Sequence, residues 1–152
     1  MKTAGEVIWQ KNKINNIISP DTLVIDALNR LNEVDLSYLI VKDGEDVVGV
    51  FSERDYARKV VLQGRSSSNT KVSDVMTVDL PEVQLTDSIE TCMKLLASQG
   101  RRYILVYDKK HFEGIITIHD LLREILLHGE RALDSKITSK LIDINERPSS
   151  VY

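Results

Sequence analysis

The chain has a single cysteine, Cys92, among its 152 residues, so no disulfide can form within it. One thiolate is also too few for a zinc site built on cysteines. No run of about 18 apolar residues is present to span a membrane, and residues 1–9 lack the apolar core of a signal peptide. These absences predict a soluble protein of the reducing cytoplasm.

An excess of positive charge is lacking as well. The 20 lysines and arginines are offset by 23 aspartates and glutamates, which leaves a formal charge of -3. Such a chain has no broad positive field to attract nucleic acid or anionic lipid, so we expect neither nucleic-acid nor membrane partners. Its length and its 42% share of hydrophobic residues are enough for one compact body with a buried core.

What the chain does contain is an internal repeat. Residues 21–64 align without a gap on residues 86–129 at a constant offset of 65. Nine aligned pairs are identical: Leu31/Leu96, Tyr38/Tyr103, Val41/Val106, Asp43/Asp108, Gly49/Gly114, Asp55/Asp120, Arg58/Arg123, Leu62/Leu127 and Gly64/Gly129. Two copies at this period indicate two similar lobes about a pseudo-twofold axis, so a site in one lobe should have a counterpart in the other.

Each copy has the same order of predicted elements: strand, helix, strand, strand, helix. The predicted strands of the first copy are 17–18, 38–41 and 47–51; those of the second include Val83, 103–107 and 112–116. The fold class is therefore α+β, with two β-α-β-β-α repeats. We divide the chain into an N-terminal helix (1–16), repeat 1 (17–64), a polar connector (65–77), repeat 2 (78–129) and a C-terminal tail (130–152).

A short motif recurs where the last strand of each copy meets the last helix. It reads Gly49-Val-Phe-Ser52-Glu-Arg-Asp55 in the first copy and Gly114-Ile-Ile-Thr117-Ile-His-Asp120 in the second. The glycine permits close approach of another backbone or a flat ring, the hydroxyl can cap the helix or reach a ligand, and the aspartate can accept hydrogen bonds from a ribose diol. Free amides at the helix start favour a phosphate. In one isolated copy simple helix capping would explain these residues, but two copies in the same register favour a nucleotide site.

With these motifs the chain resembles the cystathionine-beta-synthase (CBS) domain family, whose paired repeats are called a Bateman module. The resemblance covers Ile17 to Gly129 and also includes Pro20, the segment Val72-Ser-Asp-Val-Met-Thr77 and the string 51–59, which is typical of small bacterial CBS-pair proteins. The chain is likewise similar to the regulatory insert of IMP dehydrogenase. The resemblance implies binding of AMP, ADP or ATP, or of an NAD-type dinucleotide, in clefts between the repeats.

The resemblance also implies roles for single residues. It assigns ribose to Asp55 and Asp120, ribose or phosphate oxygens to Ser52 and Thr117, and the adenine slots to Ile18 and Val83. The remaining nucleotide-binding candidates, which would meet phosphates or precede the central strand, are Arg54, Arg102, Tyr103 and His119. Because Glu53-Arg54 and Ile118-His119 differ in charge, we expect unequal affinities at the two sites.

Other candidates have structural interpretations. Cys92 takes the position of Ala27 on an apolar helix face, which favours a core residue over a nucleophile. The histidines lack ligand spacing, so no metal site is expected. Trp9 is expected to anchor a short N-terminal helix, residues 4–12, in the core. Arg102 can equally be a solvated residue before a strand or a phosphate contact.

The helix after Asp120 is apolar on more than one face, which predicts a homodimer. The expected interface residues are Leu121, Leu122, Ile125, Leu126, Tyr56 and Val60. Functionally, we expect a non-enzymatic energy sensor that binds an adenine nucleotide and signals to a partner protein, with no catalytic residues. The alternatives are a ligand-free dimerising scaffold, an S-adenosylmethionine sensor and an enzyme.

Overall fold

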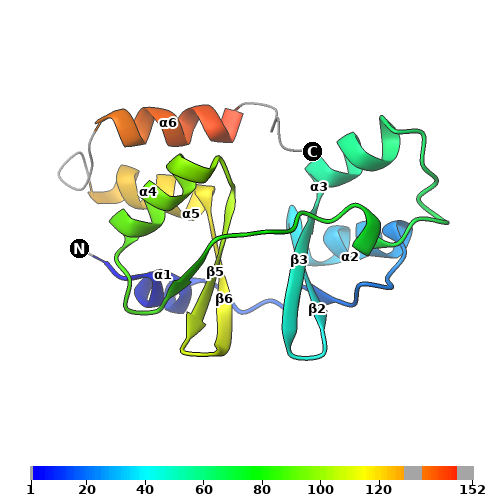
Figure 1. Cartoon of the computed structure of the whole chain (residues 1–152), viewed down its shortest axis with the longest axis horizontal. Coiled ribbons are helices and arrows are strands. Elements are labelled where there is room, and N and C mark those ends of the chain that lie inside the picture. Colours follow the sequence, from blue (N-terminus) through cyan, green and yellow to red (C-terminus); the bar gives the residue numbers. More distant parts are fainter. Residues whose placement is uncertain (1, 129–134, 147–152) are drawn as a thin grey trace. The chain divides into compact units, whose positions relative to one another are not determined.

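The computed structural model describes residues 2–128 and 135–146, which belong to two compact units. Lys13–Asp79 form the first-repeat unit, and Met1–Asn12 together with Leu80–Tyr152 form the second-repeat unit. Each unit contains one copy of the sequence repeat, and both are drawn in Figure 1. Of the predicted C-terminal tail, only residues 135–146 lie within the described part of the chain.

The first-repeat unit has a three-stranded sheet in the order β1-β2-β3. Its elements are β1 (Ile17–Ile18), α2 (Val24–Val34), β2 (Tyr38–Asp43), β3 (Asp46–Ser52), α3 (Glu53–Asp55), a π-helical turn (Tyr56–Val61) and a 3-10 turn (Val72–Asp74). The predicted order of strands and helices is confirmed. The helix that follows the motif continues as the π-helical turn, and Gly64 adopts the left-handed conformation predicted for a helix stop.

The second-repeat unit has the equivalent sheet, β4-β5-β6. Its elements are α1 (Ala4–Gln10), β4 (Glu82–Gln84), α4 (Ile89–Gln99), β5 (Tyr103–Asp108), β6 (His111–Thr117), α5 (Ile118–His128) and α6 (Ser135–Glu146). The fold class, α+β with two β-α-β-β-α repeats, is thereby confirmed. Within the described residues, no helix is long and apolar enough to cross a membrane.

The two sheets have equivalent strand pairing, including a register shift at the same position. In each sheet the first strand runs parallel to the second and the second antiparallel to the third, with Val41 opposite Gly49 and Val106 opposite Gly114. Each register shifts immediately after that pair. The motif glycine therefore lies beside a bulge, where the strand bends and another chain segment can approach it.

Each unit has its own apolar core. Val24, Leu39 and Phe51 are fully buried in the first, and Leu96, Ile104 and Ile116 are fully buried in the second. Helical spacing in α2 and α4 and the short apolar runs of the central strands place these side chains on one face. The buried residues of the two cores thus occupy equivalent positions in the two copies of the repeat.

A closing segment completes each unit, and the two segments are equivalent. In the first-repeat unit Val24 N donates to Thr70 O at 2.8 Å, and Lys71 forms a bridge with Leu23. In the second-repeat unit, Ile89 N donates to Lys2 O at 3.0 Å, and Thr3 forms a bridge with Ser88. Segment 2–11 therefore makes the same backbone contacts in the second-repeat unit as segment 70–79 makes in the first-repeat unit. In this correspondence Ala4-Gly-Glu-Val-Ile-Trp9 aligns with Val72-Ser-Asp-Val-Met-Thr77.

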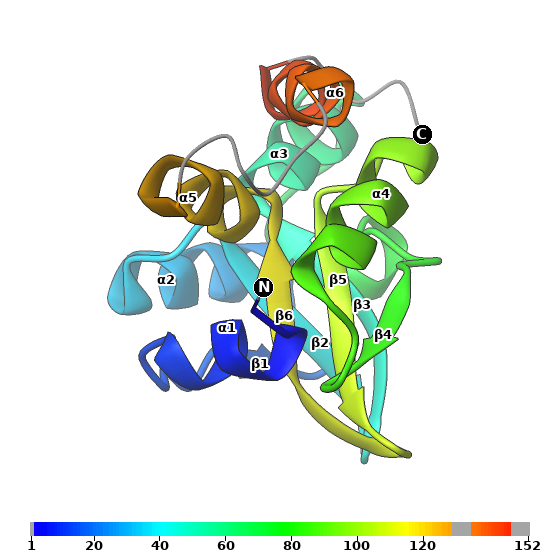
Figure 2. The same ribbon diagram turned by 90° about the vertical axis from the view of Figure 1, so that its left-hand side faces the viewer.

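The N-terminal helix begins with the predicted capping box. Thr3 Oγ1 accepts from Glu6 N at 3.3 Å, and Glu6 Oε2 accepts from Thr3 N at 3.0 Å. The helix ends at Gln10 because Lys11 is extended. Figure 2 shows α1 in front of β6, on which it packs. The prediction for Trp9 is wrong: its side chain is 69% exposed, since Val7 and Ile8 present the apolar face of this short helix to the unit.

The C-terminal helix α6 belongs to the second-repeat unit and packs along α4 and α5 (Figure 1). Leu141 is fully buried against the core, and Ile137 and Ile144 pack beside it. This helix covers part of the apolar surface of α5. Leu121, and Val60 in the other unit, are buried in their own cores, so the prediction that these two residues line a dimer interface is wrong.

Candidate functional site

The motif of the first repeat forms a closed capping box at the start of α3. Ser52 Oγ accepts from Asp55 N at 3.2 Å, while Asp55 Oδ2 accepts from Ser52 N and Ser52 Oγ, each at 3.0 Å. Both residues are buried. One carboxylate oxygen is thus used in holding the strand-to-helix turn.

The second oxygen of Asp55 also has partners. Thr77 Oγ1, from the closing segment, donates to Asp55 Oδ1 at 2.9 Å. Lys59 Nζ, one turn farther along the helical stretch, forms an ion pair with the same oxygen at 2.9 Å. Because the Asp55 side chain is only 3% exposed, these contacts supply the hydrogen bonds that burial of its charge requires.

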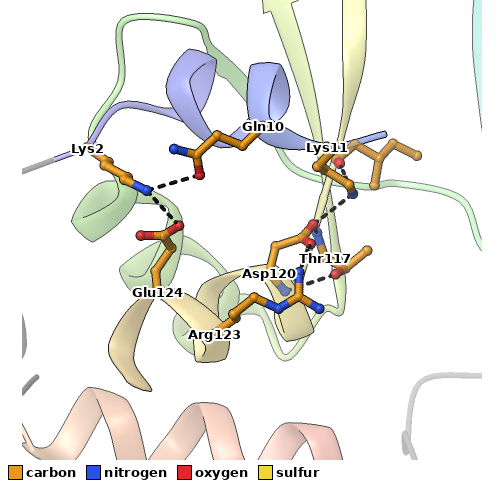
Figure 3. A network of polar contacts seen from close by, with 8 residues as sticks. Lys2, Gln10, Lys11, Thr117, Asp120, Arg123 and Glu124 are labelled. Atoms are coloured by element: carbon orange, nitrogen blue, oxygen red, sulfur yellow. Dashed lines mark hydrogen bonds and ion pairs between the residues drawn. The ribbon is translucent and has the colours of Figure 1, made fainter. Parts of the chain in front are cut away.

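The motif of the second repeat has the same box at the start of α5. Thr117 Oγ1 accepts from Asp120 N at 3.1 Å, and Asp120 Oδ2 accepts from Thr117 N at 2.9 Å. Figure 3 shows Lys11 reaching this carboxylate from the end of the N-terminal segment. Lys11 Nζ donates to Asp120 Oδ2 at 2.8 Å and to Ile115 O at 2.9 Å.

The two carboxylates are therefore neutralised from different elements. Lys59 aligns with Glu124 in the repeat, so the helix that supplies a cation to Asp55 carries an acid in the second copy. Glu124 is itself buried; its Oε1 pairs with Lys2 Nζ of the N-terminal segment at 3.2 Å, and His128 Nε2 lies 3.2 Å from its Oε2. Two lysines of one closing segment consequently bind two carboxylates of α5 (Figure 3).

The motif glycines make room for the closing segments. A Cβ placed on Gly49 would lie 2.7 Å from Met76 Sδ and 2.8 Å from Thr77 O. One placed on Gly114 would meet Ile8 Cδ1 at 3.1 Å. Each motif glycine was predicted to permit close approach of another backbone or of a flat ring, and in both units it is another chain segment that lies against the glycine.

The remaining predicted site residues lie on several elements of their units. Ile18 is half-buried on β1 and Val83 is buried on β4, each packed into the core of its own unit. Arg54 and Tyr103 are half-buried, and His119 is exposed on α5. Arg102 donates to the backbone oxygen of Ile144, so α6 holds this guanidinium. Their contacts with a nucleotide stay predictions.

Cys92 is a core residue, as expected. Its side chain is fully buried in the second-repeat unit. Burial raises the pKa of the thiol to about 12, so Cys92 stays protonated at neutral pH and is a poor nucleophile. In the part of the chain that the structure describes, no three histidine, cysteine, aspartate or glutamate side chains gather as a metal site would require.

Both copies of the repeat match a known protein family. The model of the family described as the CBS domain matches residues 12–62 and again residues 72–127. The chain belongs to the CBS domain family. Its two matches make it a CBS pair, as the motif resemblance implied.

Relatives of this CBS pair are diverse. The mitochondrial CBS domain-containing protein CBSX3 of Arabidopsis thaliana is 34% identical over 111 residues, which are 70% of this chain and 54% of that protein. The inosine-5'-monophosphate dehydrogenase of Methanocaldococcus jannaschii is 33% identical over 125 residues, 81% of this chain and 23% of the enzyme. The chain thus spans about half of the former and a minor portion of the latter.

Two solved structures show the same fold. A protein with CBS domains from Burkholderia ambifaria is 32% identical, with a TM-score of 0.76 over 88% of this chain and 100% of its own. CBSX2, solved in complex with AMP, is 26% identical, with a TM-score of 0.64 over 84% of this chain and 98% of its own. The family and its fold are therefore shown.

Sequence reasoning did not find the partners of the two aspartates. Lys11, Thr77 and Lys59 complete the polar contacts of Asp55 and Asp120 but lie outside the motif. A signal for the closing segments was available, since Ala4–Trp9 and Val72–Thr77 share Val7/Val75 and an acid one position before it. That likeness has an offset of 68 and so lies outside the 65-residue register.

Proposed function

We propose that this CBS pair is a non-enzymatic regulatory module that binds an adenine nucleotide at its Gly-x-x-Ser/Thr-x-x-Asp motifs. The observation that carries the proposal is the repetition of one geometry. In both units a buried aspartate closes the capping box of the helix start, next to a buried hydroxyl side chain. The AMP complex of CBSX2 supports adenine nucleotide as the ligand class.

The chemistry of these residues suits a ribose phosphate. A carboxylate accepts hydrogen bonds from the two hydroxyls of a vicinal diol, and the amides of a helix start favour phosphate oxygens. A regulated partner protein would respond to the occupancy of these motifs. The match to about a quarter of an IMP dehydrogenase, 23% of its length, supports a module that is used alongside other domains.

Calorimetric titration with AMP, ATP, NAD and S-adenosylmethionine tests this function, with product analysis of each mixture after incubation. We expect an adenine nucleotide to bind and to be recovered unchanged. Turnover would instead indicate an enzyme, and preferred binding of S-adenosylmethionine a different sensor. Absence of heat with all four ligands, in protein shown to be folded by circular dichroism, would leave a dimerising scaffold.

We also propose that the chain forms a homodimer through the helical stretches after each motif. Leu126 and Leu127 on α5 are 84% and 68% exposed, and Val61 and Leu62, their counterparts in the repeat, are 52% and 75% exposed. Four exposed aliphatic side chains at matching positions favour a partner surface. Light scattering should give twice the 17.2 kDa chain mass.

The matched pair of variants for this prediction is Leu126→Glu and Ile25→Glu. Ile25 is 41% exposed and belongs to α2, which is not one of the helical stretches that follow the motifs. A charge at Leu126 should yield monomer because it would be buried without a partner, whereas a charge at Ile25 should leave the mass unchanged. A wild-type chain that is monomeric at tens of micromolar, a concentration at which ordinary dimers persist, would contradict the proposal.

A further inference from the structure

The two motif aspartates differ in the hydrogen-bonding capacity that they leave for a ligand. A carboxylate offers about four acceptor positions, two on each oxygen. Asp55 Oδ2 accepts from Ser52 N and Ser52 Oγ, and Asp55 Oδ1 accepts from Thr77 Oγ1 and Lys59 Nζ. All four contacts fall between 2.9 and 3.0 Å, so this carboxylate is saturated by its own unit.

Asp120 is different. Its Oδ2 accepts from Thr117 N and Lys11 Nζ, but within the described chain its Oδ1 has only the guanidinium of Arg123, at 3.9 Å. That distance is beyond a hydrogen bond, and the Arg123 side chain is 68% exposed. The side chain of Asp120 is also more open than that of Asp55, at 10% against 3% exposed.

The difference has a cause in the sequence. The closing segment of the first-repeat unit carries Thr77, whose hydroxyl meets the aspartate, and the equivalent residue of the other closing segment is the exposed Trp9. The helix after the first motif carries Lys59, and its counterpart is Glu124. Both partners of Asp55 Oδ1 are thus replaced in the second copy, and Lys11 contacts Oδ2 instead.

We propose that Asp120 alone binds the ribose of the nucleotide, through Oδ1, and that Asp55 is a positioning residue that holds the closing segment of its unit. This proposal rests on the proposed function and adds which motif receives the ligand. A sugar hydroxyl reaching Asp55 would have to displace Thr77 or Lys59 from a buried carboxylate, which leaves a buried polar group without its partner. A hydroxyl reaching Asp120 Oδ1 displaces only a distant, solvated guanidinium.

The test is a cycle that combines one protein change with one ligand change. AMP and 2',3'-dideoxy-AMP are titrated by calorimetry into the wild type, Asp120→Asn and Asp55→Asn. In the wild type, loss of the diol should weaken binding by about ten- to hundredfold, the range for a hydrogen bond to a charged group. One AMP should bind tightly per chain.

The variants then distinguish an aspartate that contacts the ribose from one that only stabilises its unit. In Asp120→Asn, AMP should bind more weakly, and removing the diol should cost much less than in the wild type, because the neutral amide replaces the charged carboxylate that accepts from the diol. In Asp55→Asn the full effect of the diol should persist, while the melting temperature should fall below that of Asp120→Asn. If Asp55→Asn does not fold, Thr77→Val removes one partner of Asp55 and should likewise keep the diol effect.

Several results would overturn the assignment. These are two tight sites of equal affinity, a diol effect that disappears in Asp55→Asn or in Thr77→Val, and a diol effect that survives undiminished in Asp120→Asn. Tight AMP binding with any of these patterns would leave the proposed function intact and remove only the assignment to Asp120. No AMP binding by the folded wild type would instead reject both.

Discussion

Leu141→Ala is expected to lower the free energy of unfolding by about 2–5 kcal/mol, the range for truncating a fully buried leucine. Leu141 is 0% exposed and joins α6 to the core that α4, β5 and α5 share. Removing its side chain leaves a cavity beneath α6. The loss of stability therefore combines the lost burial of apolar groups with the cost of a cavity that the surrounding side chains fill only in part. Denaturant unfolding followed by far-UV circular dichroism measures it.

Ile142→Ala is the matched control on the same helix. Ile142 is 42% exposed, so its truncation removes much less buried surface and should cost under about 1 kcal/mol. Equal effects of the two changes would show that α6 does not dock through Leu141. In that case the helix could not cover the apolar surface of α5 as described.

The fold could be predicted from the sequence because both copies express the same pattern. The runs 38–41 and 103–107 predicted central strands, and β2 and β5 contain them. Gly49 and Gly114 predicted a place of close approach, and in each sheet the bulge and the closing segment lie at that glycine. Local periodicity and the repeat agree at these positions, and agreement between levels makes a sequence prediction reliable.

The polar contacts of the two aspartates could not be predicted in the same way. Lys11 lies 109 residues from Asp120 along the chain, and no local pattern relates them. The pairing follows from the route of the N-terminal segment, which adds backbone hydrogen bonds at Asp87 and Leu85 before Lys11 reaches the motif. Such contacts depend on tertiary structure, and the residue spacing within one helix or strand does not predict them.

The predictions for Trp9 and for the dimer interface depended on which side of a helix meets which neighbour. Periodicity indicates that α5 is apolar on more than one face but not what covers each face. In the structure Leu121 enters the core and Leu122 packs against it, while Leu126 and Leu127 stay exposed. Part of the apolar surface of α5 that predicted a second chain is therefore buried within the unit.

The central claim, that the motif aspartates bind an adenine nucleotide, predicts a large effect for the double variant Asp55→Ala/Asp120→Ala. Removing a carboxylate that accepts hydrogen bonds from a ribose should cost about 1.5–3 kcal/mol, or ten- to hundredfold in affinity. The double change removes such a group from every motif. Nucleotide binding should then weaken by at least about ten- to hundredfold, whichever motif receives the ligand.

The most direct measurement is the melting temperature with and without nucleotide, for the wild type and for this variant. At about 100 times the wild-type dissociation constant, the ligand should stabilise the wild type by about 2.7 kcal/mol per occupied site. At the same ligand concentration, a ten- to hundredfold weaker double variant should keep only about 0.4–1.4 kcal/mol of that stabilisation. Should the alanine variant be unfolded without ligand, the Asp55→Asn/Asp120→Asn pair, which keeps the side-chain shape, replaces it. A folded double variant that retains the full nucleotide-induced shift would mean that the aspartates only cap their helices, and would contradict the account.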